Sequence, residues 1–284
     1  MHNSWTQSVA SPLRGLRLAR EGEAVFAWDG RNDLFLFDRT GKLQAQRPAP
    51  SPVVAAGCSE DGHAFVVALS QTPSVCWLAP DLAPLWVRPL SHPATALAVE
   101  PLGDRLAVAD AGGTLHLIDS RGKSLWQAST PRALHHLTFV PEKAVLVGAS
   151  DFGLVVCFGS TGECLWRDGL VAHISSLASN GDGSCLLLTC FSDGLVRYRA
   201  EEPKQERISL DAACHLASPT YAGDYLLTAD RQNRICVRDD KGIIQDQITL
   251  DSAVLAASLA ALGDSVFVGL ANGTLRRLEL QRNR

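Results

Sequence analysis

The sequence predicts an all-β protein folded as a seven-bladed β-propeller with four antiparallel strands in each blade. The first observation is a repeat that ends an apolar run in steps of 40 or 41 residues, at Phe37, Trp77, Ile118, Phe158, Tyr198, Arg238 and Leu278. The second is a separate register at the start of that run, with steps of 39 to 41 residues, at Ala24, Ala64, Arg105, Ala144, Cys185, Tyr225 and Ser265. A period of about 40 to 45 residues containing several short strands is typical of propeller blades.

The unit at residues 93–129 shows the four expected strands most clearly. Small residues at 94–99 form the first strand, because the centre of a propeller leaves little room for side chains. Apolar runs at 105–109 and 114–118 form the second and third strands, since Val, Leu and Ile suit a pleated surface buried on both faces. The fourth strand follows at 124–129. Gly and Asp occupy the turns, where tight hairpins favour residues that tolerate positive φ.

A tryptophan marks the fourth strand in three consecutive units, at Trp86, Trp126 and Trp166. The seventh unit stops before a fourth strand, whereas the segment around Trp5 is similar to residues 124–129. We therefore predict that residues 3–10 form the outer strand of the seventh blade and close the ring, which protects the sheet edges. Residues 1–284 then form a single domain.

The composition of the chain argues against several kinds of partner and location. The formal net charge of −4 argues against a general nucleic-acid partner, which normally requires a basic face. No run of 18 apolar residues occurs, so membrane insertion is not expected. The first residues lack the basic region and apolar core of a signal peptide, which predicts no secretory leader.

The eight cysteines lack the spacing of a disulfide framework or a zinc site. Most fall in predicted strands, where cysteine packs as a small hydrophobic residue. Cys157 and Cys164 flank a turn and could approach each other, but free thiols are the favoured interpretation. Free thiols in a core predict a reducing compartment and hence a cytoplasmic location.

Two units carry a recognisable pattern. Residues 113–126 contain Gly113-Thr114, Asp119 and Trp126, and residues 154–166 contain Thr161-Gly162-Glu163 before Trp166. In this pattern the repeat resembles the WD40 and quinoprotein-like (PQQ-like) propeller superfamily, and the resemblance covers the whole chain. It implies the propeller fold without choosing between the two subfamilies.

The unit at residues 173–199 is closer to WD40, with His173, Thr189, Asp193 and Tyr198 in the characteristic positions. The resemblance implies that these four side chains form a hydrogen-bond relay that stiffens the blade.

An enzyme is disfavoured, although the question stays open at this point. Quinoprotein dehydrogenases resemble the repeat, but they are typically eight-bladed and carry adjacent cysteines against their cofactor, which this chain lacks. The sequence also lacks a Gly-rich phosphate loop, GxSxG and HExxH. We predict no catalytic residue, no cofactor and no metal.

The repeat predicts which loops share a face. Loops that enter the first strands and turns between the second and third strands emerge together around the mouth of a propeller channel. His92, Arg132 and His173 fall in three consecutive entering loops, so they are the candidate partner-binding residues. The competing interpretation is that they are solvated loop residues, or that His173 belongs to the relay.

Arginines gather in the sixth and seventh units, at Arg231, Arg234, Arg238, Arg276 and Arg277. A surface of salt bridges is favoured over a phosphate site. Arg238 occupies an apolar position of the repeat, so we expect it to pair with Asp239 or Asp240 or to extend to the rim.

The sequence therefore favours a non-catalytic scaffold or assembly subunit that binds a protein partner through loops at one propeller face. One alternative is an enzyme or small-molecule binder that uses the central channel. Another is a subunit that docks through its side or its opposite face.

Overall fold

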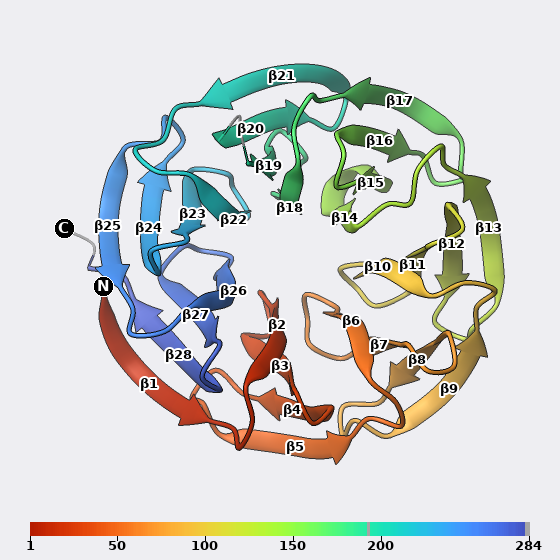
Figure 1. Cartoon of the computed structure of the whole chain (residues 1–284), viewed down its shortest axis with the longest axis horizontal. Coiled ribbons are helices and arrows are strands. Elements are labelled where there is room, and N and C mark those ends of the chain that lie inside the picture. Colours follow the sequence, from red (N-terminus) through yellow and green to blue (C-terminus); the bar gives the residue numbers. More distant parts are fainter. Residues whose placement is uncertain (192–193, 282–284) are drawn as a thin grey trace.

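The computed structural model, which describes residues 1–191 and 194–281, has seven four-stranded antiparallel sheets arranged as blades around a central axis (Figure 1). The predicted fold is confirmed. Within the described residues the helical element is η1 (Pro141–Lys143), a single 3-10 turn. No helix in this part of the chain has the length and apolar character needed to cross a bilayer.

Each blade runs from the axis to the perimeter (Figure 1). The innermost strands are β2 (Leu13–Ala19), β6 (Val53–Cys58), β10 (Ala94–Val99), β14 (His136–Val140), β18 (Ile174–Ser179), β22 (Cys214–Pro219) and β26 (Val254–Leu259). The second strands are β3 (Ala24–Asp29), β7 (Phe65–Leu69), β11 (Arg105–Asp110), β15 (Val145–Ala149), β19 (Leu186–Cys190), β23 (Tyr225–Asp230) and β27 (Ser265–Leu270). The third strands are β4 (Asp33–Phe37), β8 (Ser74–Leu78), β12 (Thr114–Asp119), β16 (Leu154–Phe158), β20 (Gly194–Arg199), β24 (Arg234–Asp239) and β28 (Thr274–Glu279). The perimeter strands are β5 (Leu43–Pro48), β9 (Pro84–Pro89), β13 (Ser124–Ser129), β17 (Cys164–Gly169), β21 (Glu202–Ile208), β25 (Ile244–Thr249) and β1 (His2–Ser8).

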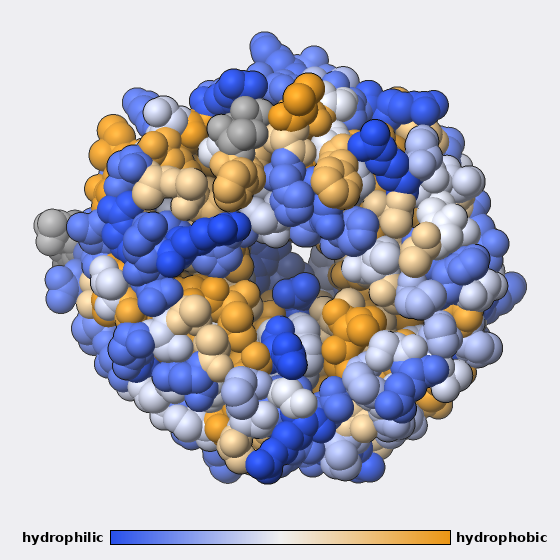
Figure 2. Space-filling model, in the orientation of Figure 1, coloured by the Kyte–Doolittle hydropathy of each residue, from blue (hydrophilic) through white to orange (hydrophobic). Residues whose placement is uncertain are grey.

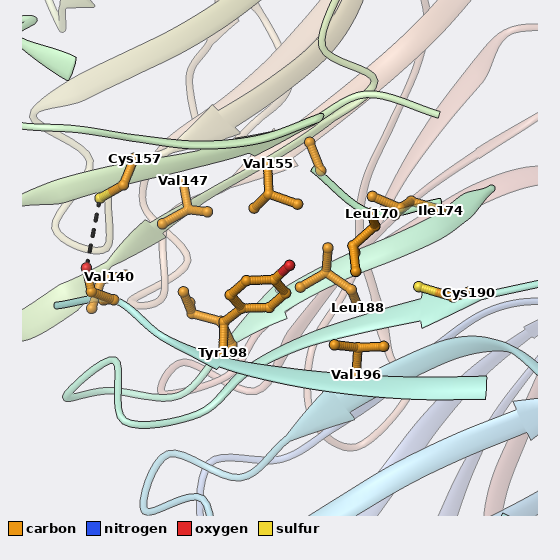
Figure 3. Close-up of a cluster of buried hydrophobic side chains, with 13 residues drawn as sticks. Val140, Val147, Val155, Cys157, Leu170, Ile174, Leu188, Cys190, Val196 and Tyr198 are labelled. Atoms are coloured by element: carbon orange, nitrogen blue, oxygen red, sulfur yellow. Dashed lines mark hydrogen bonds between the residues drawn. The ribbon is translucent and has the colours of Figure 1, made fainter. Parts of the chain in front are cut away.

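Burial follows position within the blade. Every residue of β7 and β8 is buried, because both faces of these middle strands pack against neighbouring blades. The perimeter strand β13 instead alternates between half-buried and exposed residues, with Trp126 on its inner side. We number the blades 1 to 7 along the chain, from the one that begins with β2 to the one that begins with β26. Figure 3 shows one of the resulting cores, in which Tyr198 packs with Val147, Val155 and Leu188 between blades 4 and 5.

The N-terminal strand closes the ring as predicted. β1 pairs antiparallel with β28, and Trp5 lies opposite Arg277 (Figure 1). The strand spans residues 2–8, one residue earlier at its start and two shorter at its end than the predicted 3–10. The first and last strands of the chain therefore build one sheet together.

The marker tryptophans join neighbouring blades. In each case the indole Nε1 donates to a backbone carbonyl 34 residues later, in the turn between the third and fourth strands of the next blade: Trp5 to Arg39 at 3.0 Å, Trp86 to Ser120 at 2.8 Å, Trp126 to Ser160 at 2.9 Å and Trp166 to Ala200 at 2.8 Å. Three of these indoles also pack on a glycine of that turn, at Gly41, Gly122 and Gly162. Trp5 makes the same contact as the others, which confirms that β1 is a true fourth strand.

Turns between the first and second strands link blades at the opposite end of the axis. Their backbone amides donate to the next turn around the ring: Glu21 to Glu60, Glu60 to Pro101, Glu142 to Gly181, Gly181 to Tyr221 and Tyr221 to Ala261, all at 2.9 to 3.1 Å. Pro101 has no amide hydrogen and cannot donate, so the series is interrupted between blades 3 and 4. These bonds fix the relative positions of the innermost strands, which line the channel.

Candidate protein-interaction face

Two sets of loops emerge on one side of the disc, as expected. The turn after the second strand bonds to the loop that enters the first strand of the same blade, as Gly30 to Pro12 (2.8 Å) and Ser70 to Pro52 (3.0 Å) show through their backbones. We call this side the loop face, and the side with the turns between first and second strands the turn face.

His92, Arg132 and His173 all lie exposed on the loop face. His92 packs on the turn of its own blade, where a Cβ added to Gly112 would come within 2.4 Å of its ring. His92 therefore lies apart from Arg132 and His173, which are linked to each other as described next.

Phe152 brings Arg132 and His173 together. The Arg132 Nη1 donates to the Phe152 carbonyl oxygen at 2.7 Å, and the His173 ring meets the Phe152 ring edge-on, with centroids 5.8 Å apart. Phe152 occupies the turn between β15 and β16, yet 70% of its surface is exposed. Single exposed apolar residues are common, so the importance of Phe152 depends on the residues that gather around it.

The contacts continue onto blades 5 and 6. The backbone amide of Phe191 donates to the His173 carbonyl oxygen at 2.9 Å, and the Arg231 guanidinium lies over the Phe191 ring at 5.3 Å from its centroid. Phe191 is 65% exposed. We call Arg132, Phe152, His173, Phe191 and Arg231 the aromatic arc. It crosses three neighbouring blades on the loop face.

Two histidines contact the turn that carries Phe152, at one end of the aromatic arc. Asp151, next to Phe152 in sequence, lies 3.4 Å from the His136 Nε2 and 3.7 Å from the His135 Nδ1. Burial lowers the pKa of His136, although Asp151 opposes that effect, so the imidazole favours its neutral form. The His136 Nε2 also lies 3.3 Å from the Ile174 carbonyl oxygen of the next blade. These contacts hold the base of the Phe152 turn in place.

The expected WD40 relay does not form among its described members. Thr189 bonds through its hydroxyl to Ser175 and Ser176, both at 2.8 Å, and Tyr198 donates its hydroxyl to the Asp168 carboxylate at 2.9 Å. His173 instead belongs to the aromatic arc, through its contacts with Phe152 and Phe191. The fourth expected member, Asp193, lies outside the described residues. The ring of Tyr198 stacks against Trp166 of the preceding blade, so packing takes the place of the relay here.

Ion pairs occupy most of the arginine cluster, as favoured from the sequence. Arg276 pairs with Asp251 at 2.7 Å, and Arg277 approaches Glu23 at 3.5 Å. The expected partner of Arg238 was wrong. This buried guanidinium bonds to Asp211, rather than to Asp239 or Asp240, and also to the Thr228 hydroxyl and the Gly242 carbonyl. Its side chain is buried, and the carboxylate that it meets there comes from Asp211 in the loop that enters β22.

The aromatic members of the arc were missed from the sequence. Phe152 and Phe191 stand in turns where other units carry Gly, Ala or polar residues. This departure from the repeat pattern is the sequence signal that could have identified them. The two residues are linked through His173 because blades 4 and 5 are neighbours in the ring.

All eight cysteines are free thiols, including Cys157 and Cys164. Six are buried, Cys58 is half-buried and Cys164 is exposed. Desolvation raises the pKa of Cys58 and Cys157 to about 12. Thiols of this kind stay protonated and unreactive near pH 7.

Sequence comparison agrees with this architecture. Residues 2–137 and 113–198 match a family model described as outer membrane protein assembly factor BamB, and together they cover more than half of the chain. No curated protein matches the chain. With its seven blades and this match, the chain belongs to the BamB-like family of PQQ-like propellers.

Proposed function

We propose that the protein is a non-catalytic interaction module that binds a protein partner through the aromatic arc on its loop face. The observation that carries the proposal is the pair of exposed rings, Phe152 and Phe191, with Arg231 over the Phe191 ring and Arg132 bonded to the Phe152 backbone carbonyl. Aromatic side chains and arginine are the residue types that contribute most to binding energy at protein interfaces. The fold supports this use, because a closed disc holds its loops in fixed positions.

The charges of the arc favour an acidic partner segment. Arg132 and Arg231 form no ion pair within the described part of the chain, and they lie at the two ends of the arc. A segment that carries acidic and apolar side chains would neutralise both guanidinium groups and cover the rings between them. His92, the third residue predicted from the sequence, would extend the contact toward blade 3.

Affinity purification from the native cell, followed by mass spectrometry, tests the proposal. The comparison uses the wild type, the double variant F152S/F191S and the control L102S. Leu102 is 69% exposed, close to the 70% of Phe152, but it lies on the turn face. We expect proteins recovered with the wild type and L102S to be depleted about tenfold or more with F152S/F191S. Equal recovery with all three baits would contradict the proposal, and selective loss with L102S would assign binding to the turn face.

The eight free thiols support the further proposal that the protein works in the cytoplasm. Cell fractionation with immunodetection should recover it with soluble cytoplasmic markers. Recovery from an oxidising compartment would overturn this location without affecting the arc.

A further inference from the structure

The innermost strands of all seven blades enclose a cavity of about 510 Å³ on the axis of the disc. The central opening is visible in the space-filling view (Figure 2). This volume is in the range that holds a small molecule. The cavity is separate from the aromatic arc, whose rings do not line it.

Strand β2 and Arg20, which follows it directly, supply the positive charge in this cavity. Arg14, Arg17 and Arg20 all line it, although residues three apart normally point to opposite faces of a strand. A β-bulge between Leu13 and Gly15 changes the register and allows both Arg14 and Arg17 to face the channel. Strongly hydrophilic surface accordingly borders the opening on the β2 side (Figure 2).

Arg17 is held in a fixed position. Its Nε donates to the Ala56 carbonyl oxygen at 3.0 Å, its Nη1 donates to the Leu16 carbonyl oxygen at 3.1 Å, and its Cζ lies 6.0 Å from the Trp28 ring centroid. Trp28 reaches this place because Gly15 lacks a side chain; a Cβ there would come within 2.2 Å of the indole. A guanidinium has five N–H donors, so three remain for a ligand.

Neither Arg14 nor Arg17 forms an ion pair with a described residue, whereas Arg20 is neutralised. Arg20 binds Glu60 through two nitrogens and reaches the Ser179 carbonyl oxygen, at 3.5 Å, on the far side of the channel near the turn face. The channel therefore holds two uncompensated positive charges. Enclosure by protein lowers the pKa of Arg17 through desolvation, but arginine keeps its charge at any physiological pH. Walls of low dielectric strengthen the attraction of these charges for an anion.

Hydroxyl groups from other blades also line the cavity. Those of Thr95 and Thr138 bond to protein oxygens, whereas the hydroxyls of Ser218 and Ser258 have no partner among the described residues and are available to a ligand. Such groups can donate to oxyanions without adding negative charge. From this arrangement we propose that the channel binds a small multivalent oxyanion, a polycarboxylate or a phosphate, with Arg17 as its main ligand and Arg14 as a second positive contact. Planar guanidinium groups suit both chemistries because they can bind two oxygens at once.

Isothermal titration calorimetry with citrate and, separately, with inorganic phosphate tests this site at constant ionic strength. The variants are R17M, R14M and the control R121M, whose exposed arginine lies in the turn between β12 and β13, outside both the channel and the aromatic arc. We expect R17M to weaken binding at least about tenfold and R14M to weaken it less, because R14M removes a charge that has no fixed geometry. R121M should bind like the wild type. A preference for citrate or for phosphate would identify the ligand class.

Thermal melts of R17M and R14M show whether each variant is folded, and R14M keeps the test valid if R17M is unstable. The proposal is overturned if neither probe binds the wild type, or if R17M and R14M bind as the wild type does. The F152S/F191S variant should keep full anion affinity, so failure of the arc and failure of the channel site are distinguishable.

Discussion

Blades 3 and 4 are joined at the perimeter by an indole, whereas blades 5 and 6 are joined there by a guanidinium. At the first junction Trp126 donates to the Ser160 carbonyl and packs on Gly162. At the second, Glu206 stands in the tryptophan position, and Arg197 donates to the Asp240 carbonyl at 3.3 Å while pairing with Glu206. Both junctions satisfy a carbonyl in the same turn of the next blade. The two junctions therefore share their geometry, but only the first of them also packs an aromatic ring on the neighbouring turn.

The largest effect should come from breaking the junction that closes the ring. Deleting residues 1–10 removes β1, exposes the edge of β28 and removes the Trp5 contact with blade 1. We expect the melting temperature to fall by about 10 °C or more in circular dichroism melts. The single change W5A should lower it by less. A truncated protein that melts like the full-length chain would show that closure adds little stability.

A tryptophan junction in the interior of the ring should come next. W126A should lower the free energy of unfolding by about 2 to 3 kcal/mol, because it removes both a hydrogen bond and aromatic packing against Phe158. Urea denaturation measures the change. The matched control is L125A, since Leu125 is the exposed neighbour on the same strand, and its effect should stay below about 0.5 kcal/mol.

The polar junction should cost less to break. R197A should lower the free energy of unfolding by about 1 kcal/mol, because its partner Glu206 is largely exposed and solvent screens the pair. The same urea experiment decides this. If R197A costs as much as W126A, apolar burial is not what distinguishes the two kinds of junction.

Acid should lower the stability of the protein by protonating Asp211, which pairs with Arg238. The hydrogen bond from Arg238 lowers the pKa of Asp211 to about 2, compared with about 3.9 for an unfolded aspartate. The carboxylate thus stabilises the fold above pH 4, and this contribution is lost as the pH falls toward 2. Because Asp211 is partly exposed, the effect should stay below about 1 kcal/mol. In urea denaturation D211N should show a shallower fall in stability over this range, and a profile parallel to the wild type would count against the assignment.

The repeat made the blades, their number and the closing strand predictable. A period near 40 residues places every strand, and Trp5 could be matched to the other markers by its neighbours alone. Contacts between blades were not predictable in this way. Arg238 and Asp211 are 27 residues apart, and the arc joins turns from three blades. Such pairs depend on the rotation from one blade to the next, which the period does not encode.

The candidate site was predicted only in part. The shared face of the entering loops followed from strand direction, and His92, Arg132 and His173 all lie there. The bulge that brings Arg14 and Arg17 into the channel left no sequence signal that could be read, because Gly15 and Trp28 are compatible with a regular strand as well.

The tryptophan contact has a direction, because each indole reaches forward to the turn of the following blade. One repeat unit therefore supplies a donor for its successor and an acceptor for its predecessor. A gene segment encoding a whole unit could be duplicated or exchanged with its joints intact. Because every contact spans two units, adding or removing a whole number of 40-residue units would leave each indole with an acceptor, whereas a change of length within the 34 residues between an indole and its carbonyl would move the two apart.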